Sequence, residues 1–289
     1  MSSREKQRAN VCAWSESAPY WERHAEVIRA MFEPISDALI EAAALEPGKS
    51  ALDVGAGTGE PALRIAEICG PSTRVACTDV IAEMVAAAKR EAARRELRNV
   101  TFTQCAADAL PFRSHQFDAV VCRLGIMFFE DAIASMREML RVLGPDGRVA
   151  FAVWHESKCN PFFSATLEVV ARYAQLPPTP PDTRGAFRYA EPGKLARLLA
   201  RAGATAVSDR VLDFRIEAPV GISDFWPLRV DMSETIRGLL PKIPAGRIRQ
   251  IQEEVERAIR PYFPGGRMSF PARAIIVSAG PVHGGLHTQ

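Results

Sequence analysis

The sequence predicts an α/β fold, in which an open and mostly parallel sheet carries helices on its faces. A short apolar run at residues 50–54 is followed at once by a glycine-rich turn, Gly55 to Gly59. A second apolar run ends in Asp79, about 20 residues past that turn. Further predicted strands lie at residues 100–105, 117–122 and 148–154. A strand, a glycine turn and a strand-end acid in this order are typical of nucleotide-binding sheets.

The glycine turn has the spacing GxGxG and follows a strand that carries Asp53. Glycines allow a turn sharp enough for backbone N–H groups and the start of the next helix to approach a ligand. By itself such a turn is weak evidence, because dinucleotide enzymes use similar loops. Asp79 lies at the distance where a carboxylate accepts hydrogen bonds from two ribose hydroxyls. Together the two features predict a site for a nucleoside-bearing cofactor.

Other polar side chains fall at the same edge of the predicted sheet. Asp108 follows the third strand, Cys122 and Arg123 end the fourth, and His155 follows the fifth. Open α/β sheets bind their ligands at the carboxyl ends of the strands. We therefore expect one site that draws residues from several strands.

Five sequence blocks in this order resemble a known family. They are LDVGAGTG, TDVIAEMVAAAK, ADALPF, FDAVVCRLGIMFF and RVLGPDGRVAF. From about Pro47 to Trp154 the chain resembles the class I S-adenosylmethionine-dependent methyltransferases, and among them the small-molecule branch similar to ubiquinone/menaquinone-biosynthesis methyltransferases. It departs from the family pattern at Ala56, where cysteine is common, and at Ile81, where a serine or threonine commonly caps the next helix.

The resemblance implies a Rossmann-like seven-stranded sheet with an antiparallel last strand, a helical N-terminal segment and a helical cap insertion. It also implies S-adenosyl-L-methionine as cofactor and S-adenosyl-L-homocysteine as product. Asp53 would act through water or on the amino group, Asp79 would hold the ribose, and Asp108 would face the adenine amino group. The implied cofactor-binding residues are Asp53, Gly55, Ala56, Gly57, Thr58, Gly59, Asp79, Val80, Met84, Ala107, Asp108, Ala109, Cys122 and Arg123.

The expected reaction is in-line displacement of the methyl group onto an oxygen, nitrogen, sulfur or carbon atom of a small-molecule acceptor. A sulfonium methyl is already electrophilic, so aligning the acceptor and excluding water supply most of the catalysis. For a hydroxyl or ammonium acceptor, His24, His155 or Tyr20 is expected to remove or guide the proton. A thiolate, a tertiary amine or an enolate carbon needs little such help.

The expected domain organisation has five parts. They are a helical segment over the active site at 1–46, the cofactor-binding core at 47–215, a substrate-selecting helical cap at 216–266, the last core strand at 267–279 and a mobile tail at 280–289. The N-terminal helical pattern is expected to break at Pro34, and it places Trp21 beside Tyr20 and His24 as a pocket candidate.

The cap is expected to form helices at 222–228, 233–240 and 245–262. Its large apolar residues, Phe225, Trp226, Met232 and Tyr262, are candidates for a substrate pocket or for the core of the cap. The sequence therefore places substrate choice in this insertion but leaves the pocket residues open.

Composition favours a cytoplasmic enzyme without a metal. The chain has 289 residues and a net charge of +2, so no broad basic field for nucleic acid is expected. No apolar run approaches the ~20 residues that span a bilayer, and the N-terminus lacks the apolar core of a signal peptide. Six cysteines are scattered without a CxxC pair, and glycines between His283 and His287 oppose a metal-binding helix. Oligomeric state is not determined by the sequence.

Three other functions compete with this one. An NAD(P)-dependent oxidoreductase normally has GxGxxG, and no tyrosine here is followed by lysine four positions later. A nucleic-acid amino-methyltransferase is disfavoured because the segment 122–125, CRLG, has neither prolines nor a stacking aromatic residue. A non-catalytic protein that binds S-adenosylmethionine remains open.

Overall fold

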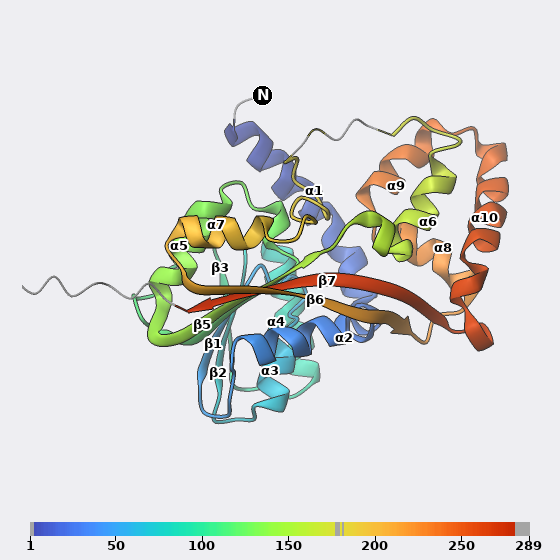
Figure 1. The fold of residues 1–289 in the computed structure, drawn as a ribbon. Coiled ribbons are helices and arrows are strands. Elements are labelled where there is room, and N and C mark those ends of the chain that lie inside the picture. Colours follow the sequence, from blue (N-terminus) through green and yellow to red (C-terminus); the bar gives the residue numbers. More distant parts are fainter. Residues whose placement is uncertain (1–2, 177–179, 181, 281–289) are drawn as a thin grey trace, which may run out of the picture.

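The computed structural model describes residues 3–176, 180 and 182–280, and its centre is a seven-stranded sheet of order β3-β2-β1-β4-β5-β7-β6 (Figure 1). Strands β1 to β5 pair in parallel, whereas β7 runs antiparallel to both β5 and β6. The predicted Rossmann-like sheet with an antiparallel last strand is confirmed. The strands are β1 Ser50–Val54, β2 Arg74–Asp79, β3 Val100–Gln104, β4 Phe117–Arg123, β5 Leu143–Trp154, β6 Thr205–Ala218 and β7 Met268–Gly280.

Helices pack on both faces of this sheet. Helices α5 and α7 lie on one face, and α2 and α3 lie on the other (Figure 1). The inner strands β1, β4, β5 and β7 are mostly buried, as expected where a sheet is covered on both sides, whereas the edge strands β3 and β6 are largely exposed or half-buried. The helices of this core and of the N-terminal segment are α1 Ser3–Arg23, α2 Ala25–Ala42, α3 Ala62–Ile68, α4 Ala82–Arg94, α5 Ala132–Val142 and α7 Lys194–Ala202.

The remaining helices lie together beyond the last residues of β6 and the first residues of β7 (Figure 1). They are α6 Pro161–Val170, α8 Ile222–Asp231, α9 Glu234–Leu239 and α10 Ala245–Ile259. Phe162 of α6, Phe225 of α8 and Phe270 of β7 meet with ring centroids 5.2–5.7 Å apart. Tyr262 stacks on Phe270 at 4.6 Å. Phe225 and Tyr262 thus belong to the core of this helical group.

Two local expectations differ from the structure. Helix α2 continues through Pro34, and the chain breaks instead at His24, between α1 and α2. Proline removes one helical hydrogen bond, but the buried face of α2, which includes Met31, Ile35 and Leu39, favours a continuous helix. Strand β5 begins at Leu143, within the expected turn, because Leu143 pairs with Phe117 of β4.

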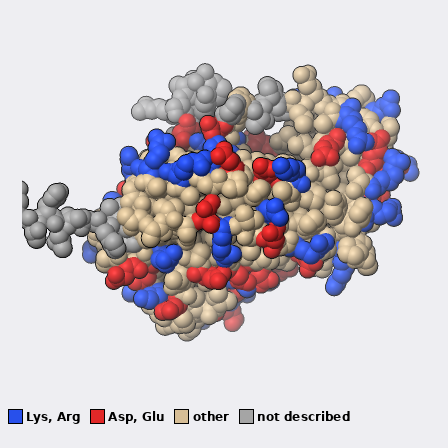
Figure 2. Space-filling view, in the orientation of Figure 1, with Lys and Arg blue, Asp and Glu red and all other residues tan. Residues whose placement is uncertain are grey.

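The surface carries charges of both signs. Figure 2 shows lysines and arginines interspersed with aspartates and glutamates over the face in view. Within the described part of the chain, no helix is long and apolar enough to cross a membrane. The same residues contain no cluster of His, Cys, Asp and Glu that could hold a metal ion. The predicted mobile tail, with His283 and His287, lies outside the described residues except for Gly280.

Candidate functional site

A cavity of about 270 Å³ opens at the carboxyl ends of the five parallel strands. The loops after β1, β2, β3 and β4 and the end of β5 form its wall, and helices α1, α6 and α8 add side chains from outside the sheet. Most of the predicted cofactor-binding residues meet here. Those on the wall are Gly55, Ala56, Gly57, Thr58, Asp79, Val80, Met84, Ala107, Asp108 and Arg123.

The Asp79 carboxylate fixes the glycine loop to the end of β2. Its Oδ2 accepts a hydrogen bond of 2.9 Å from the Gly57 N–H, and its Oδ1 accepts one of 2.9 Å from the Ile81 N–H. Burial raises the pKa of Asp79, and these backbone hydrogen bonds oppose that rise. Each carboxylate oxygen accepts more than one hydrogen bond, so the oriented group still has acceptor positions for a ligand.

The glycine loop itself depends on left-handed backbone. Gly59 has φ +112°, and a Cβ there would lie 2.8 Å from Leu63 Cδ1 and 3.2 Å from Ala88 Cβ. Gly57 has φ +55°, but a Cβ there would meet no atom within 4 Å. An L side chain at either position would be strained by the positive φ, but only at position 59 would it also be crowded by its neighbours.

We expect Gly59→Ala to lower the free energy of unfolding by about 2–4 kcal/mol, and the matched variant Gly57→Ala by only about 1 kcal/mol. Both substitutions place an L side chain at positive φ, but only the first adds steric overlap. Urea unfolding of the two variants measures the difference. Equal losses would show that crowding beneath the loop is unimportant.

Asp53 lies beneath the cavity wall and is fully buried. Its Oδ2 accepts a hydrogen bond of 2.9 Å from the Ala62 N–H, while its Oδ1 has no partner among the described residues. Burial raises the pKa of Asp53 to about 7, although the Ala62 hydrogen bond and the charge of Arg123 oppose the rise. An unsatisfied buried oxygen of this kind destabilises the fold unless a ligand or water meets it.

Three other predicted cofactor-binding residues are not brought to the cavity wall. Gly59 faces Leu63 and Ala88, and Cys122 is fully buried in the core. Ala109 is exposed, and its N–H donates to the carbonyl of Ala106. From these positions the three residues, like Asp53, can contribute to cofactor binding only indirectly.

The three candidate proton-transfer residues also lie off the cavity wall. Tyr20 and His24 lie where the N-terminal helices contact α8 and α9. His24 Nε2 is 2.8 Å from Asp231 Oδ2, and the Arg237 guanidinium lies 4.6 Å from the Tyr20 ring centroid. His155 is largely buried, and its Nδ1 accepts a hydrogen bond of 2.8 Å from the Glu156 N–H. Proton transfer by these residues stays a prediction that their positions do not support.

Aromatic side chains form much of the wall away from the glycine loop. From α1, Trp14 packs with ring centroids 5.0 Å from Phe128 and 5.6 Å from Trp21, which also lines the cavity. On the other side, Trp154 at the end of β5 lies 5.5 Å from Phe32 and 4.9 Å from Phe163. Apart from Trp21, these residues cannot be identified from the sequence, because aromatic residues at helical or strand spacing look like ordinary core.

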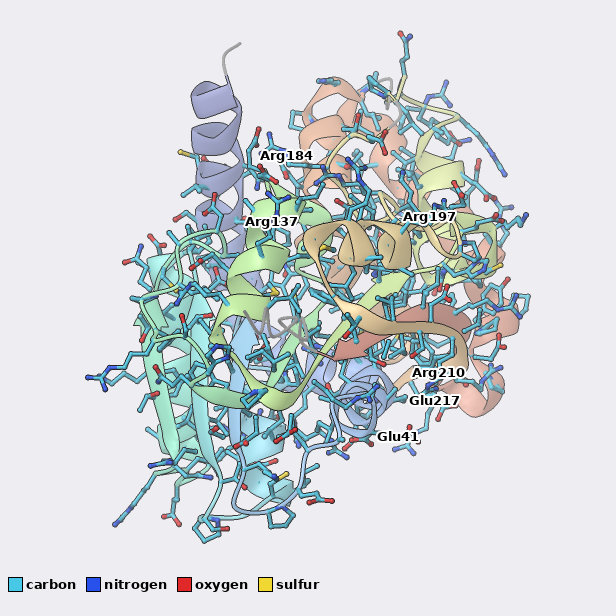
Figure 3. The ribbon with its side chains drawn as sticks, turned by 60° about the vertical axis from the view of Figure 1, so that its left-hand side comes forward. Glu41, Arg137, Arg184, Arg197, Arg210 and Glu217 are labelled. Atoms are coloured by element: carbon cyan, nitrogen blue, oxygen red, sulfur yellow. The ribbon has the colours of Figure 1, made fainter. Side chains whose placement is uncertain are left out.

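Cationic side chains also reach the wall. Arg123 donates a hydrogen bond of 2.9 Å from Nη1 to Ser36 Oγ, and Arg184 forms an ion pair with Glu130. Figure 3 shows Arg184 near α1. Arg210 and Glu41, which form a surface ion pair of 2.8 Å, lie well below Arg184 in the same view. Arg229 and Met232, from the end of α8, complete this side of the cavity. Met232 was among the candidate pocket residues; Trp226 is not on this wall.

A family model described as a methyltransferase domain matches residues 52–151. The uncharacterized protein Rv1405c of Mycobacterium tuberculosis is 31% identical over 161 residues, which cover 54% of this chain and 56% of that protein. The ubiquinone/menaquinone biosynthesis C-methyltransferase UbiE of Cellvibrio japonicus is 34% identical over 111 residues, which cover 38% of this chain and 45% of that enzyme. The matches thus span about half the length of these relatives.

Solved structures share the fold at low sequence identity. The YcgJ protein of Bacillus subtilis aligns with a TM-score of 0.54 and 21% identity, covering 86% of this chain and 98% of that one. A methyltransferase-like protein of Bacillus halodurans aligns with a TM-score of 0.53 and 19% identity, covering 85% and 98%. The fold therefore extends well beyond the segment in which the sequences match.

Proposed function

We propose that this chain binds S-adenosylmethionine in the sheet-edge cavity and methylates a small molecule. Its residues 52–151 match a methyltransferase domain and resemble the class I S-adenosylmethionine-dependent enzymes of the UbiE type. The observation that carries the proposal is the Asp79 carboxylate, which is oriented by two backbone N–H groups and lines the cavity directly beside the glycine loop. A fixed acid at the end of the second strand suits the ribose of a nucleoside.

The residues present fit this cofactor in charge and shape. Asp79 would hold the ribose hydroxyls, and Asp108 with Ala107 would meet the adenine. The unpartnered Oδ1 of Asp53 would meet the cofactor's amino group through water. The left-handed glycines keep side chains away from the loop, so a ligand can approach its backbone. When bound, the cofactor supplies an electrophilic sulfonium methyl group.

The chain's own contribution to methyl transfer is positioning and the exclusion of water. Trp14 and Phe128 pack over one side of the cavity, and Phe32, Trp154 and Phe163 form the other. An apolar enclosure of this kind holds an acceptor in line with the methyl group and keeps competing water out. Among the wall residues, arginine, glutamate, aspartate, serine and threonine are present but histidine is not, so transfer that needs no histidine base suits this site.

The proposal is tested by incubating the full chain with S-adenosylmethionine and a metabolite panel and measuring formation of S-adenosylhomocysteine. Acceptor-dependent product is expected with the parent chain and is expected to disappear with Asp79→Ala. Binding of the cofactor without turnover on any acceptor would instead favour a non-catalytic binding protein. Absence of binding at millimolar concentration would refute the proposal.

A further inference from the structure

Arg229 is a buried cation on the wall of the cavity. It lies near the end of α8 and is only 4% exposed, and it lines the cavity together with Phe163 and Met232. Its Nε is buried without a hydrogen-bond partner, and its guanidinium forms no hydrogen bond or ion pair with any residue that the structure describes. A buried charge is normally paired or hydrogen-bonded, so this arginine requires another explanation.

Two phenylalanine rings surround the guanidinium. Its carbon lies 4.6 Å from the centroid of Phe162 and 5.3 Å from that of Phe163. Burial lowers the pKa of Arg229 to about 10, which still leaves it charged at neutral pH. The rings attract the cation through their faces, but they accept none of its five N–H donors in the way that a carboxylate does. The donors therefore lack the partner that a planar anion would supply.

The position of Arg229 separates it from the proposed cofactor residues. Asp79 ends β2 and Asp108 follows β3, whereas Arg229 lies beside Phe163 of α6, which contacts Trp154 at the end of β5. In the strand order, β2 and β3 lie on one side of β1, and β4 and β5 lie on the other. The cavity thus has an acidic end, with Asp79 and Asp108 near the glycine loop, and a second end near α6 and α8 that holds Arg229.

We infer that Arg229 binds the carboxylate of an apolar methyl acceptor, with the rings of Phe32, Trp154 and Phe163 enclosing the acceptor's body. This inference rests on the proposed function and names the substrate class of the same cavity. Arg184, another arginine on the wall, pairs with Glu130, so the pair adds no net charge. Arg123, the third arginine on the wall, donates a hydrogen bond to Ser36 and interacts with the charges of Glu60 and Asp53. Among the described residues, Arg229 has neither a hydrogen-bond partner nor an acidic partner, and its one positive charge matches a monoanion such as a carboxylate better than a phosphate dianion.

The inference is tested with three probes that share one phenyl-ethyl body: 3-phenylpropanoate, 3-phenylpropanamide and 2-phenylethyl phosphate. Calorimetric titrations use the full chain, with and without saturating S-adenosylhomocysteine. The parent chain is expected to bind the carboxylate at least about tenfold more tightly than the amide, the range of a charge-assisted hydrogen bond. Arg229→Met is expected to abolish that preference and to leave S-adenosylhomocysteine affinity within about twofold.

Two further variants separate charge from packing. Arg229→Lys keeps the charge and is expected to retain part of the carboxylate preference. Arg249→Met removes an arginine from α10 whose side chain is 90% exposed, and it is expected to behave like the parent chain. No preference for the carboxylate in the parent chain, a preference that survives in Arg229→Met, or tighter binding of the phosphate would each overturn the inference. Failure of S-adenosylhomocysteine to bind, with the carboxylate preference intact, would remove the proposed function and leave an anion site.

A stability measurement tests whether the role of Arg229 is purely structural. Replacing an unpaired buried charge by an apolar side chain of similar length is often neutral or stabilising. The urea midpoint of Arg229→Met is therefore expected to stay equal to that of the parent chain or to rise, although carboxylate binding is lost. A lower midpoint together with unchanged carboxylate preference would assign Arg229 to the packing of the cap instead.

Discussion

Replacing Asp79 by alanine should weaken the binding of S-adenosylhomocysteine by at least about 100-fold. Hydrogen bonds to a charged group contribute about 1.5–3 kcal/mol each, and a ribose offers two hydroxyls to this carboxylate. The substitution also leaves the N–H groups of Gly57 and Ile81 without their acceptor, so the glycine loop loses its link to β2. Isothermal titration calorimetry of the variant measures the loss.

Asp118 offers a matched control for this experiment. It lies at the start of β4, whereas the cavity lies at the other end of that strand. Its Oδ2 accepts hydrogen bonds of 2.8 Å from both the N–H and the Oγ of Ser50. Asp118→Ala therefore removes a carboxylate with two local hydrogen bonds but no place in the proposed site. It should lose some stability and bind S-adenosylhomocysteine within about twofold of the parent chain. Similar affinities for the Asp79 and Asp118 variants would refute the ribose assignment.

Replacing Asp53 by asparagine should change how stability depends on pH. The pKa of Asp53 rises from 3.8 to about 7 in the folded chain because the carboxyl is buried. As the pH increases between these values, the unfolded chain releases this proton before the folded chain does. Ionisation therefore favours the unfolded state across this window, and the penalty is complete above pH about 7.

The parent chain is expected to lose roughly 2–3 kcal/mol more stability between about pH 5 and about pH 8 than Asp53→Asn does. Burial also raises the pKa of Asp79, which contributes a loss of the same sign, but that contribution is present in both proteins. Comparing the two proteins by urea unfolding at each pH therefore isolates the Asp53 part. Parallel pH profiles would mean that Asp53 ionises normally in the fold.

The sheet and the glycine loop were predictable because their requirements are local. A buried parallel strand followed by glycines leaves few alternatives for the backbone, and the loop adopts positive φ at Gly55, Gly57 and Gly59. Acids at successive strand ends converge because parallel strands end at one edge. Asp79 and Asp108 therefore reach one cavity although they are far apart in the sequence.

The remaining wall depends on contacts between segments that no local pattern specifies. Tyr20 and His24 were expected at the site, but the packing of α1 against the cap turns them toward Arg237 and Asp231. Trp14 reaches the cavity instead. The two N-terminal helices also separate at His24 and not at Pro34, where the break was expected.

Arg229 could have been identified from its spacing. It follows Phe225 by four positions, so the two residues lie on one side of a helix, and Phe225 is fully buried. A charged residue on the apolar side of a helix is the observation that points to a ligand or an ion pair. The expected helix ended at residue 228, one position too early to include it, whereas α8 continues to Asp231.

The assignment of the cavity is decided by a crystal structure of the chain bound to S-adenosylhomocysteine. We predict the ribose hydroxyls within hydrogen-bond distance of the Asp79 carboxylate and the adenine beside Asp108, at the acidic end of the cavity. Ligand density at any other place, or a ribose that makes no contact with Asp79, would contradict the assignment.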